Sequence, residues 1–230
     1  MLELQDIGFR QDDFSLCADL SLPKGGRFAV IGASGSGKST LLSLIGGFLA
    51  PDQGRVMWNG RDITGMAPGE RPISTLFQHH NLFPHLTVKQ NIGMGLRPDL
   101  RLDASQRDRV AQVLDQVGLS GMGDRRPAAL SGGQQSRVAL ARVLLRARPI
   151  LLLDEPFAAL GPALKSEMLS LLTDIADGTE ATVLMVTHDP QDARIFSPQT
   201  ILVEDGRAHA PRDTGPLLDN PPPGLRAYLG

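Results

Sequence analysis

The chain has little cysteine, little excess charge and no long apolar run, and each shortage excludes a class of protein. Its 230 residues include one cysteine, Cys17, which excludes an internal disulfide framework and suits a reducing compartment. The formal net charge is −2, without blocks of Lys or Arg, so the basic face typical of nucleic-acid binders is missing. No stretch approaches the roughly 18 apolar residues that a membrane-spanning helix needs. We therefore expect no nucleic-acid partner, and we expect any membrane to be reached through another protein.

A glycine-rich loop follows a short apolar strand expected at residues 27–31 and leads into a helix expected at residues 39–49. Strand, glycine loop and helix are the context of a P-loop, in which backbone N–H groups surround the phosphates of ATP. Lys38 would reach the β- and γ-phosphate oxygens, and the Ser39 hydroxyl would ligate Mg²⁺. The nucleotide contacts expected from this loop are Gly32, Ser34, Gly35, Ser36, Gly37, Lys38, Ser39 and Thr40.

A second phosphate-recognising device lies about a hundred residues downstream, where residues 130–134 have the sequence Leu-Ser-Gly-Gly-Gln. A Ser-Gly-Gly turn at the start of an expected helix leaves N–H groups unpaired, and the positive end of the helix dipole favours an anion. The expected contacts with a nucleotide are Ser131, Gly132, Gly133 and Gln134.

Two carboxylates stand at the end of a continuous apolar strand expected at residues 150–153. Open α/β sheets place their ligands at the carboxyl ends of their strands, which is where Asp154 and Glu155 lie. Alone, such a pair is more often part of a solvated loop, but the P-loop upstream favours a catalytic interpretation. Asp154 is then placed to hold Mg²⁺, directly or through a water molecule, and Glu155 to polarise the water that attacks the γ-phosphate.

Together these motifs resemble the ATP-binding subunits of the ABC transporter family, over nearly all of residues 2–207. The resemblance implies that two copies associate head to tail, with each ATP between the P-loop of one copy and the Ser-Gly-Gly turn of the other. It also implies two further catalytic residues. His188 stands at the position of the family's switch histidine, which reaches the γ-phosphate. Gln78 stands at the position of the Q-loop glutamine, which touches Mg²⁺ or the attacking water. Without the resemblance, either residue would be taken as structural or solvated.

The adenine ring needs an aromatic face, and Phe9 and Phe14 lie near the first expected strand. Counting back from the P-loop by analogy with the family favours Phe9, although either ring could belong to the core. The chain also departs from the family pattern. Gly161 replaces an aspartate that normally contacts the opposing subunit, and residues 135–137 have the sequence Gln-Ser-Arg where Arg or Lys followed by Gln is commoner. We expect these departures to slow or loosen hydrolysis without abolishing it.

The expected fold class is α/β: a P-loop NTPase core with a mainly parallel sheet, an antiparallel β layer and a helical lobe, as in an ABC ATPase cassette. Alternation over residues 2–9 and 14–22 predicts the antiparallel part, as does the tight-turn signal Asn59-Gly60. A capping-box pattern, Thr87-Val-Lys-Gln90, predicts a helix start in the lobe.

The domain organisation follows from these elements. The ABC ATPase domain is expected over residues 1–210, with the helical lobe, about residues 84–147, inserted in the P-loop core. Five prolines mark residues 211–230 as an irregular tail.

Residues 82–92 resemble the importer form of the helical lobe, which docks a cytoplasmic helix of a membrane subunit. Phe83 and Leu86 would be apolar contacts there, although local packing explains them equally well. The resemblance implies a homodimer that binds a transmembrane permease at the cytoplasmic face of the inner membrane and is linked indirectly to a periplasmic solute-binding protein.

Among importers, the resemblance is closest to those for thiamine, through residues 41–49, 71–78 and 91–96. Spermidine, iron and molybdate remain open as cargo, because the ATPase subunit never touches the solute. A different class of answer is a mechanical ATPase acting on DNA or ribosomes. Such proteins interrupt the cassette with a long coiled coil or typically carry two cassettes, and this sequence has neither feature.

Overall fold

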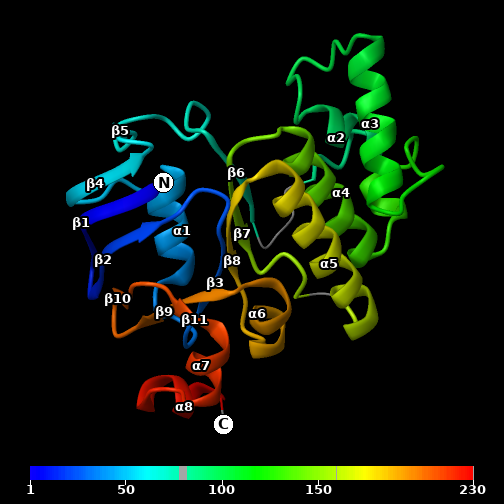
Figure 1. Ribbon diagram of the computed structural model, residues 1–230. Helices are drawn as coiled ribbons and strands as arrows, with labels where there is room; N and C mark the ends of the chain where they lie inside the picture. Colours follow the sequence, from blue (N-terminus) through cyan, green and yellow to red (C-terminus); the bar gives the residue numbers. More distant parts are fainter. Residues whose placement is uncertain (78–81, 159, 230) are drawn as a thin grey trace.

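A computed structural model describes residues 1–77, 82–158 and 160–229 (Figure 1). The strands are β1 (Leu2–Gln11), β2 (Phe14–Leu22), β3 (Arg27–Ile31), β4 (Gln53–Trp58), β5 (Arg61–Asp62), β6 (Ile73–Leu76), β7 (Ile150–Asp154), β8 (Thr182–Val186), β9 (Gln199–Glu204), β10 (Arg207–Ala208) and β11 (Arg212–Asp213). The helices are α1 (Lys38–Gly46), α2 (Val88–Gly93), α3 (Ala104–Gln116), α4 (Gly132–Leu145), α5 (Pro162–Thr179), α6 (Pro190–Phe196), α7 (Thr214–Asp219) and α8 (Pro223–Leu229), with a short 3₁₀ helix, η1, at Pro127–Ala129.

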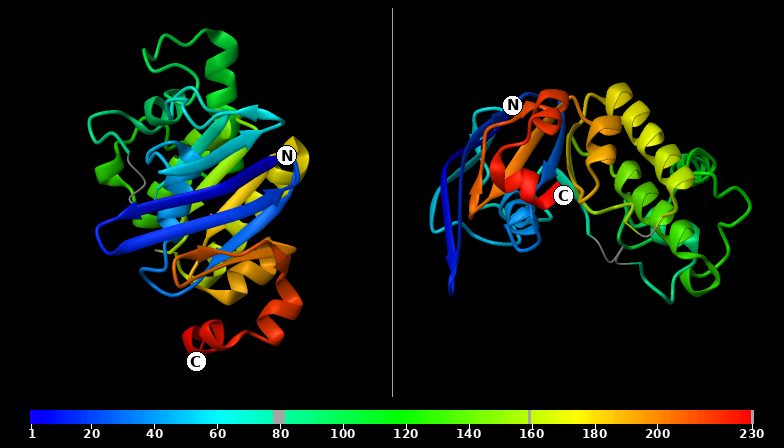
Figure 2. Two further views of the ribbon diagram at one scale, coloured as in Figure 1. Left: turned by 90° about the vertical axis from the view of Figure 1, so that its left-hand side faces the viewer. Right: turned by 90° about the horizontal axis from the view of Figure 1, so that it is seen from below.

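One continuous sheet of 11 strands forms the body of the protein, in the order β5-β4-β1-β2-β10-β9-β3-β8-β7-β6, with β11 paired to β9. The segment β9-β3-β8-β7-β6 is parallel, and β5-β4-β1-β2 is antiparallel. The sheet curls so that α1 lies inside the curve (Figure 2). The expected parallel and antiparallel parts are therefore both present, joined in one sheet through β10. In the described part of the chain, no helix combines the length and apolarity needed to cross a bilayer.

The parallel strands are apolar at almost every position because both of their faces are covered. On one face, Ile150 and Leu152 of β7 pack in a cluster with Leu41 of α1. On the other, Leu151 and Leu153 pack in a cluster with residues of α4 and α5. Successive side chains of a strand point to opposite faces, so one run of leucines fills two cores. This sandwich fixes the carboxyl end of β7, where the paired carboxylates emerge.

The helices α2, α3 and α4 surround an apolar cluster of their own that includes Val88, Val110 and Val138. Figure 1 shows them to one side of the sheet. The predicted capping box is present: the Thr87 side chain accepts from the Gln90 N–H, and the Gln90 side chain accepts from the Thr87 N–H. It satisfies two donors that the first turn of α2 would otherwise leave unpaired.

Two expectations about secondary structure were wrong, one about where a helix ends and one about the C-terminal tail. The helix after the P-loop ends at Gly46, three residues early, because Gly47 adopts a left-handed conformation (φ 80°) and its N–H closes the helix on Leu44. The C-terminal tail is not irregular: residues 214–219 and 223–229 are the helices α7 and α8. Their prolines stand in first turns, where a missing N–H costs nothing, so proline does not exclude a helix there.

Candidate active site

The P-loop joins β3 to α1 through three glycines with positive φ: Gly32 (152°), Gly35 (77°) and Gly37 (108°). The space around these glycines is as restrictive for a side chain as their backbone conformation is. A Cβ on Gly32 would lie 2.0 Å from the Val203 carbonyl oxygen, and one on Gly37 would lie 2.8 Å from the ring of Phe14. Only glycine fits at these two positions, so the sequence pattern is imposed by the close approach of neighbouring strands as well as by the turn itself.

Lys38 is buried at the start of α1, and its Nζ donates to the carbonyl oxygens of Gly32 and Ala33, both at 2.8 Å. Burial lowers the pKa of Lys38, while the charges of Glu155 and Asp154 act in the opposite direction. The ammonium group is thus held inside the loop, facing the two carboxylates at the end of β7. A phosphate in this loop would meet a cation that is already desolvated and oriented.

The parallel register of β7 and β8 brings the predicted catalytic residues together. Asp154 pairs with Val186, and the Glu155 N–H donates to the Val186 carbonyl at 3.2 Å, so the residues after both strands become neighbours. Glu155 turns out of the strand with a left-handed backbone (φ 46°). Its Oε2 lies 3.1 Å from Nδ1 of His188. Two residues predicted to be catalytic, Glu155 and His188, are therefore in contact within one chain.

The oxygen atoms available at and around Asp154 are suitable ligands for Mg²⁺. Burial raises the pKa of Asp154, while a hydrogen bond with the Ser39 side chain and the charge of Lys38 lower it. A carboxylate and a hydroxyl are hard oxygen ligands of the kind that Mg²⁺ prefers, and a divalent cation would compensate the charge of this half-buried carboxylate. Gln78, the third predicted metal contact, lies outside the described residues.

A hollow of about 460 Å³ opens beside the P-loop. It is bordered by P-loop residues 32–36, by Phe14, by the β9–β10 turn and by α8. Phe9, the ring favoured for the adenine, does not border it: Phe9 lines an adjacent hollow together with Asp52 and Gln53. The structure therefore places Phe14, not Phe9, next to the phosphate loop.

The Ser-Gly-Gly turn lies apart from the hollow beside the P-loop. None of the predicted residues of that turn borders the hollow. Ser131 caps α4: its Oγ accepts from the Gln134 N–H at 3.3 Å, and Gln134 Oε1 accepts from the Ser131 N–H at 3.0 Å. Ser131 and Gly132 are exposed. The turn that the sequence predicts to recognise an anion is thus exposed and does not border the hollow beside the P-loop of its own chain.

Sequence reasoning missed how the loop after β8 is held. Lys165 of α5 binds Asp189 at 2.9 Å and Asp192 at 3.3 Å, on either side of the start of α6. The Thr187 hydroxyl donates to Asp192 at 2.9 Å. Asp189 before Pro190 is a recognisable helix cap, but its pairing with Lys165 spans 24 residues and follows only from the packing of α5 on α6.

Residues 17–158 match the protein family described as ABC transporter. The chain belongs to the ABC transporter family. It is 63% identical, over the whole length of both chains, to the thiamine import ATP-binding protein ThiQ of Cereibacter sphaeroides. It is 54% identical, again over both full lengths, to the protein of that name from Ruegeria sp. (strain TM1040), and 50% identical to the one from Yersinia pseudotuberculosis, over 95% of this chain and 93% of the relative.

Solved structures of the ABC cassette MJ0796 share the fold. One is a dimeric post-hydrolysis state bound to ADP and Pi, with a TM-score of 0.83 and 30% sequence identity over 93% of this chain and 99% of that chain. A second dimeric structure of MJ0796 gives a TM-score of 0.82. The predicted fold class is confirmed, and so is the activity: this ABC chain is an ATPase that binds ATP.

Proposed function

We propose that this ABC ATPase powers the import of thiamine through a separate membrane permease. The observation that carries the proposal is full-length identity of 63% to a thiamine import protein, with no part of either chain unmatched. We take the hollow beside the P-loop as the nucleotide site and call it the nucleotide hollow. It is lined by the phosphate loop and neighbouring residues, so it carries no information about the cargo.

The catalytic unit of the proposal is a head-to-tail homodimer. Ser131 and Gly132 are exposed and stand apart from the P-loop hollow of their own chain, so each nucleotide site lacks one of its two anion-recognising devices. A second copy would supply it, and the same exchange would complete the other site by symmetry. Dimeric structures of MJ0796 support this arrangement.

Within each site we assign the residues as follows. Backbone N–H groups of the P-loop bind the phosphates, and Lys38 neutralises the β- and γ-phosphate oxygens. Ser39, Asp154 and Gln78 would hold Mg²⁺, which supplies charge stabilisation to the transferring phosphoryl group. Glu155 accepts a proton from the attacking water, and His188, in contact with Glu155, holds that carboxylate and the γ-phosphate side of the site in place.

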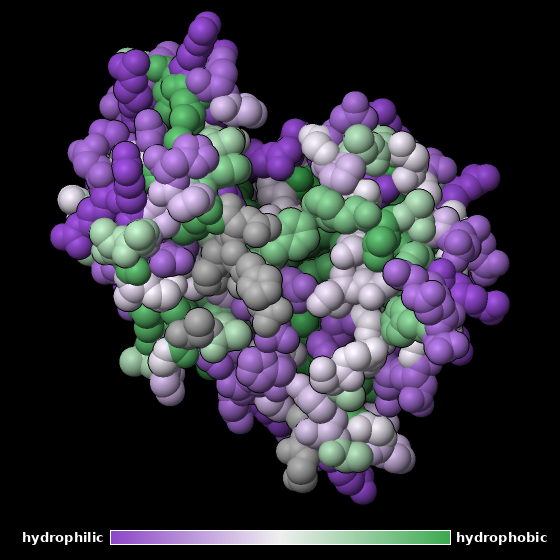
Figure 3. All heavy atoms as spheres, turned by 180° about the vertical axis from the view of Figure 1, so that it is seen from behind, coloured by the Kyte–Doolittle hydropathy of each residue, from purple (hydrophilic) through white to green (hydrophobic). Residues whose placement is uncertain are grey.

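The surface offered to the permease lies between the helical lobe and the core. Figure 3 shows hydrophobic side chains along this hollowed region of the rear face. Phe48 is 47% exposed and packs edge to face on Phe77, with 5.0 Å between the ring centroids. Phe83, at the start of the lobe, is 39% exposed. Aromatic side chains are enriched at protein–protein interfaces. We propose that they receive a cytoplasmic helix of the permease, which places the chain at the cytoplasmic face of the inner membrane.

Reconstitution with the cognate permease tests the proposed cargo. The chain is co-purified with its membrane partner and placed in proteoliposomes with the solute-binding protein outside. We expect thiamine to stimulate ATP hydrolysis, whereas spermidine, iron and molybdate leave the basal rate unchanged. Stimulation by one of those solutes instead of thiamine would show that the proposed cargo is wrong while the proposed transport role is right. Failure of any membrane protein to co-purify would reject the transport role.

A further inference from the structure

The C-terminal helix α8 forms one wall of the nucleotide hollow. Gly224, Leu225 and Tyr228 border it, opposite the P-loop. Leu225 is 1% exposed and belongs to an apolar cluster with Ile31, the last residue of β3, and Leu202 of β9. Helix α8 is therefore packed on the strand that leads into the P-loop.

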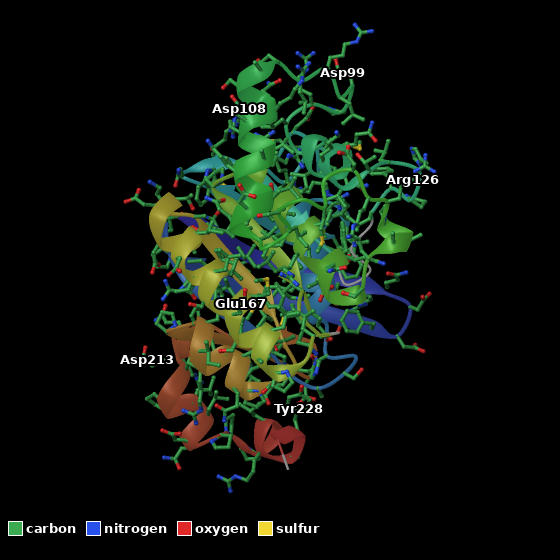
Figure 4. All side chains as sticks on the ribbon, turned by 90° about the vertical axis from the view of Figure 1, so that its right-hand side faces the viewer. Asp99, Asp108, Arg126, Glu167, Asp213 and Tyr228 are labelled. Atoms are coloured by element: carbon green, nitrogen blue, oxygen red, sulfur yellow. The ribbon has the colours of Figure 1, made fainter. Side chains whose placement is uncertain are left out.

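One side chain of α8 reaches the catalytic loop. The Tyr228 hydroxyl donates to the carbonyl oxygen of His188 at 3.1 Å, joining positions 40 residues apart. Figure 4 shows Tyr228 pointing from α8 toward the body of the protein. Burial, followed by the charges of Glu155 and Asp189, raises the pKa of Tyr228, so the hydroxyl keeps its proton and remains a donor throughout the neutral range.

The contact matters because packing does little to hold His188. The His188 side chain is 55% exposed and contacts Oε2 of Glu155. Its neighbours are fixed from the other side, where Lys165 binds Asp189 and the Thr187 hydroxyl accepts from the Asp189 N–H at 3.1 Å. The peptide group between His188 and Asp189 is therefore held at both edges: its N–H donates to the Thr187 hydroxyl, and its carbonyl accepts from Tyr228. Loss of the Tyr228 donor would free the carbonyl edge, allow this peptide group to tilt, and loosen the alignment of the His188 side chain with Glu155.

We propose that Tyr228 is a positioning residue for ATP hydrolysis: its hydroxyl fixes the main chain of His188 and thereby aligns the Glu155–His188 pair. The proposal rests on the catalytic roles proposed above for these two residues. It gives the C-terminal helix a function in the ATPase cycle, because any movement of α8 would reach the pair through one hydrogen bond.

Steady-state hydrolysis by the full-length chain tests the proposal with Tyr228→Phe, which keeps the ring and its packing and removes only the donor. We expect kcat to fall about fivefold, the worth of one hydrogen bond, with KM for ATP and the thermal midpoint unchanged. Arg226→Gln is the matched control, because Arg226 is exposed on the same helix and its side chain donates to the carbonyl oxygen of Pro221. Its kcat should equal that of the wild type. A purely structural tyrosine would give the opposite pattern: Tyr228→Phe like wild type, and Tyr228→Ala impaired in stability and KM alike.

A double-mutant cycle distinguishes the positioning role of Tyr228 from the catalytic role proposed for His188. Single-turnover rates at high enzyme concentration are compared for His188→Ala with and without Tyr228→Phe. We expect no further loss in the His188→Ala background, because no imidazole remains to be positioned. An additive fivefold loss would overturn the positioning role, as would an unchanged kcat in Tyr228→Phe alone. A fully active His188→Ala would instead reject the catalytic role of the histidine.

Discussion

Glu155 leaves its strand in a conformation that few non-glycine residues adopt. A left-handed backbone (φ 46°) is uncommon for glutamate, and such strain persists where the surroundings determine it. Here the surroundings are the hydrogen bond from the Glu155 N–H to Val186 on the adjacent strand and the contact with His188. The two carboxylates were predictable from an apolar strand ending in Asp-Glu. The turn and the contact were not, because they depend on which strand lies alongside β7.

Glu155→Gln keeps the size and shape of the side chain and removes its ability to accept a proton. We expect kcat to fall at least about 100-fold, the usual contribution of a general base, while ATP affinity stays within about twofold. Hydrolysis and nucleotide binding are measured on the same preparation. Glu167→Gln, on the exposed outer face of α5 (Figure 4), is the control and should behave like wild type. Normal turnover in Glu155→Gln would remove this residue from the mechanism.

Phe14 and Phe9 can be distinguished by affinity. The ring of Phe14 lies against Gly37 and borders the nucleotide hollow, whereas Phe9 borders the adjacent one. Stacking of a base on an aromatic ring is worth about 1–3 kcal/mol, so Phe14→Ala should weaken ATP binding about fivefold or more. Phe9→Ala should weaken it less. Titration with a fluorescent ATP analogue compares the two variants, and a larger loss for Phe9→Ala would restore the assignment made from the sequence.

At the scale of elements, α5 and α6 are joined beside the catalytic loop by Lys165, Asp189 and Asp192. The hydrogen bond from Lys165 lowers the pKa of Asp189. Although burial acts in the opposite direction, the bonds to Asp189 and Asp192 raise the pKa of Lys165. Asp189 also caps α6, since its Oδ1 accepts from the Gln191 N–H at 2.9 Å. The pairing therefore stabilises both the helix start and the loop that carries His188.

Asp189→Asn retains a good helix cap and removes the charge. We expect it to lower the free energy of unfolding by about 0.5–1 kcal/mol at pH 7, a small value because the Asp189 side chain is about a third exposed. A carboxyl with a lowered pKa stabilises the fold above its unfolded pKa, near 4, and loses that contribution as the pH falls through its folded pKa. The difference from wild type should therefore persist at pH 5 and be smaller at pH 3, because part of it is lost once the pH falls below about 4.

Urea denaturation at the three pH values measures this difference. The control is Asp174→Asn on the exposed side of α5, which should match wild type throughout. A deficit in Asp189→Asn that is independent of pH would assign the effect to the helix cap and not to the ion pair.

The C-terminal helices show where composition misleads. Proline density suggested an irregular tail, yet Leu217, Leu218 and Leu225 are buried in one cluster with β3 and β9. The useful signal was the position of each proline relative to the following leucines: Pro216 and Pro223 begin short apolar segments. Helix starts elsewhere were predictable because a capping box is local, as at Thr87. Docking of α8 beside the P-loop joins distant parts of the chain, and no local pattern encodes it.

At the scale of the whole molecule, the sequence motifs predicted both anion-recognising devices, and the fold separates them. The family pattern also places an aspartate where this chain has Gly161. Gly161 caps α5 without a side-chain bond, and a Cβ there would meet no described residue of its own chain within 4 Å, its two sequence neighbours aside. The position therefore has room for a larger residue within the monomer. We expect its effect, like that of Ser131, to arise at the proposed contact between two copies.

Cross-linking across the nucleotide tests the completed site most directly. Cys17, the only cysteine of the chain, is replaced by Ser, and cysteines are introduced as Ser34→Cys in the P-loop and Ser131→Cys in the Ser-Gly-Gly turn, with Glu155→Gln to prevent turnover. A bifunctional thiol reagent long enough to span a bound nucleotide is added, because cysteines on the two sides of ATP lie too far apart for a direct disulfide. The head-to-tail dimer predicts a cross-linked dimer that forms with ATP, fails to form without it, and needs both cysteines. Monomers that stay unlinked at saturating ATP, or linkage indifferent to ATP, would contradict a site shared between two copies.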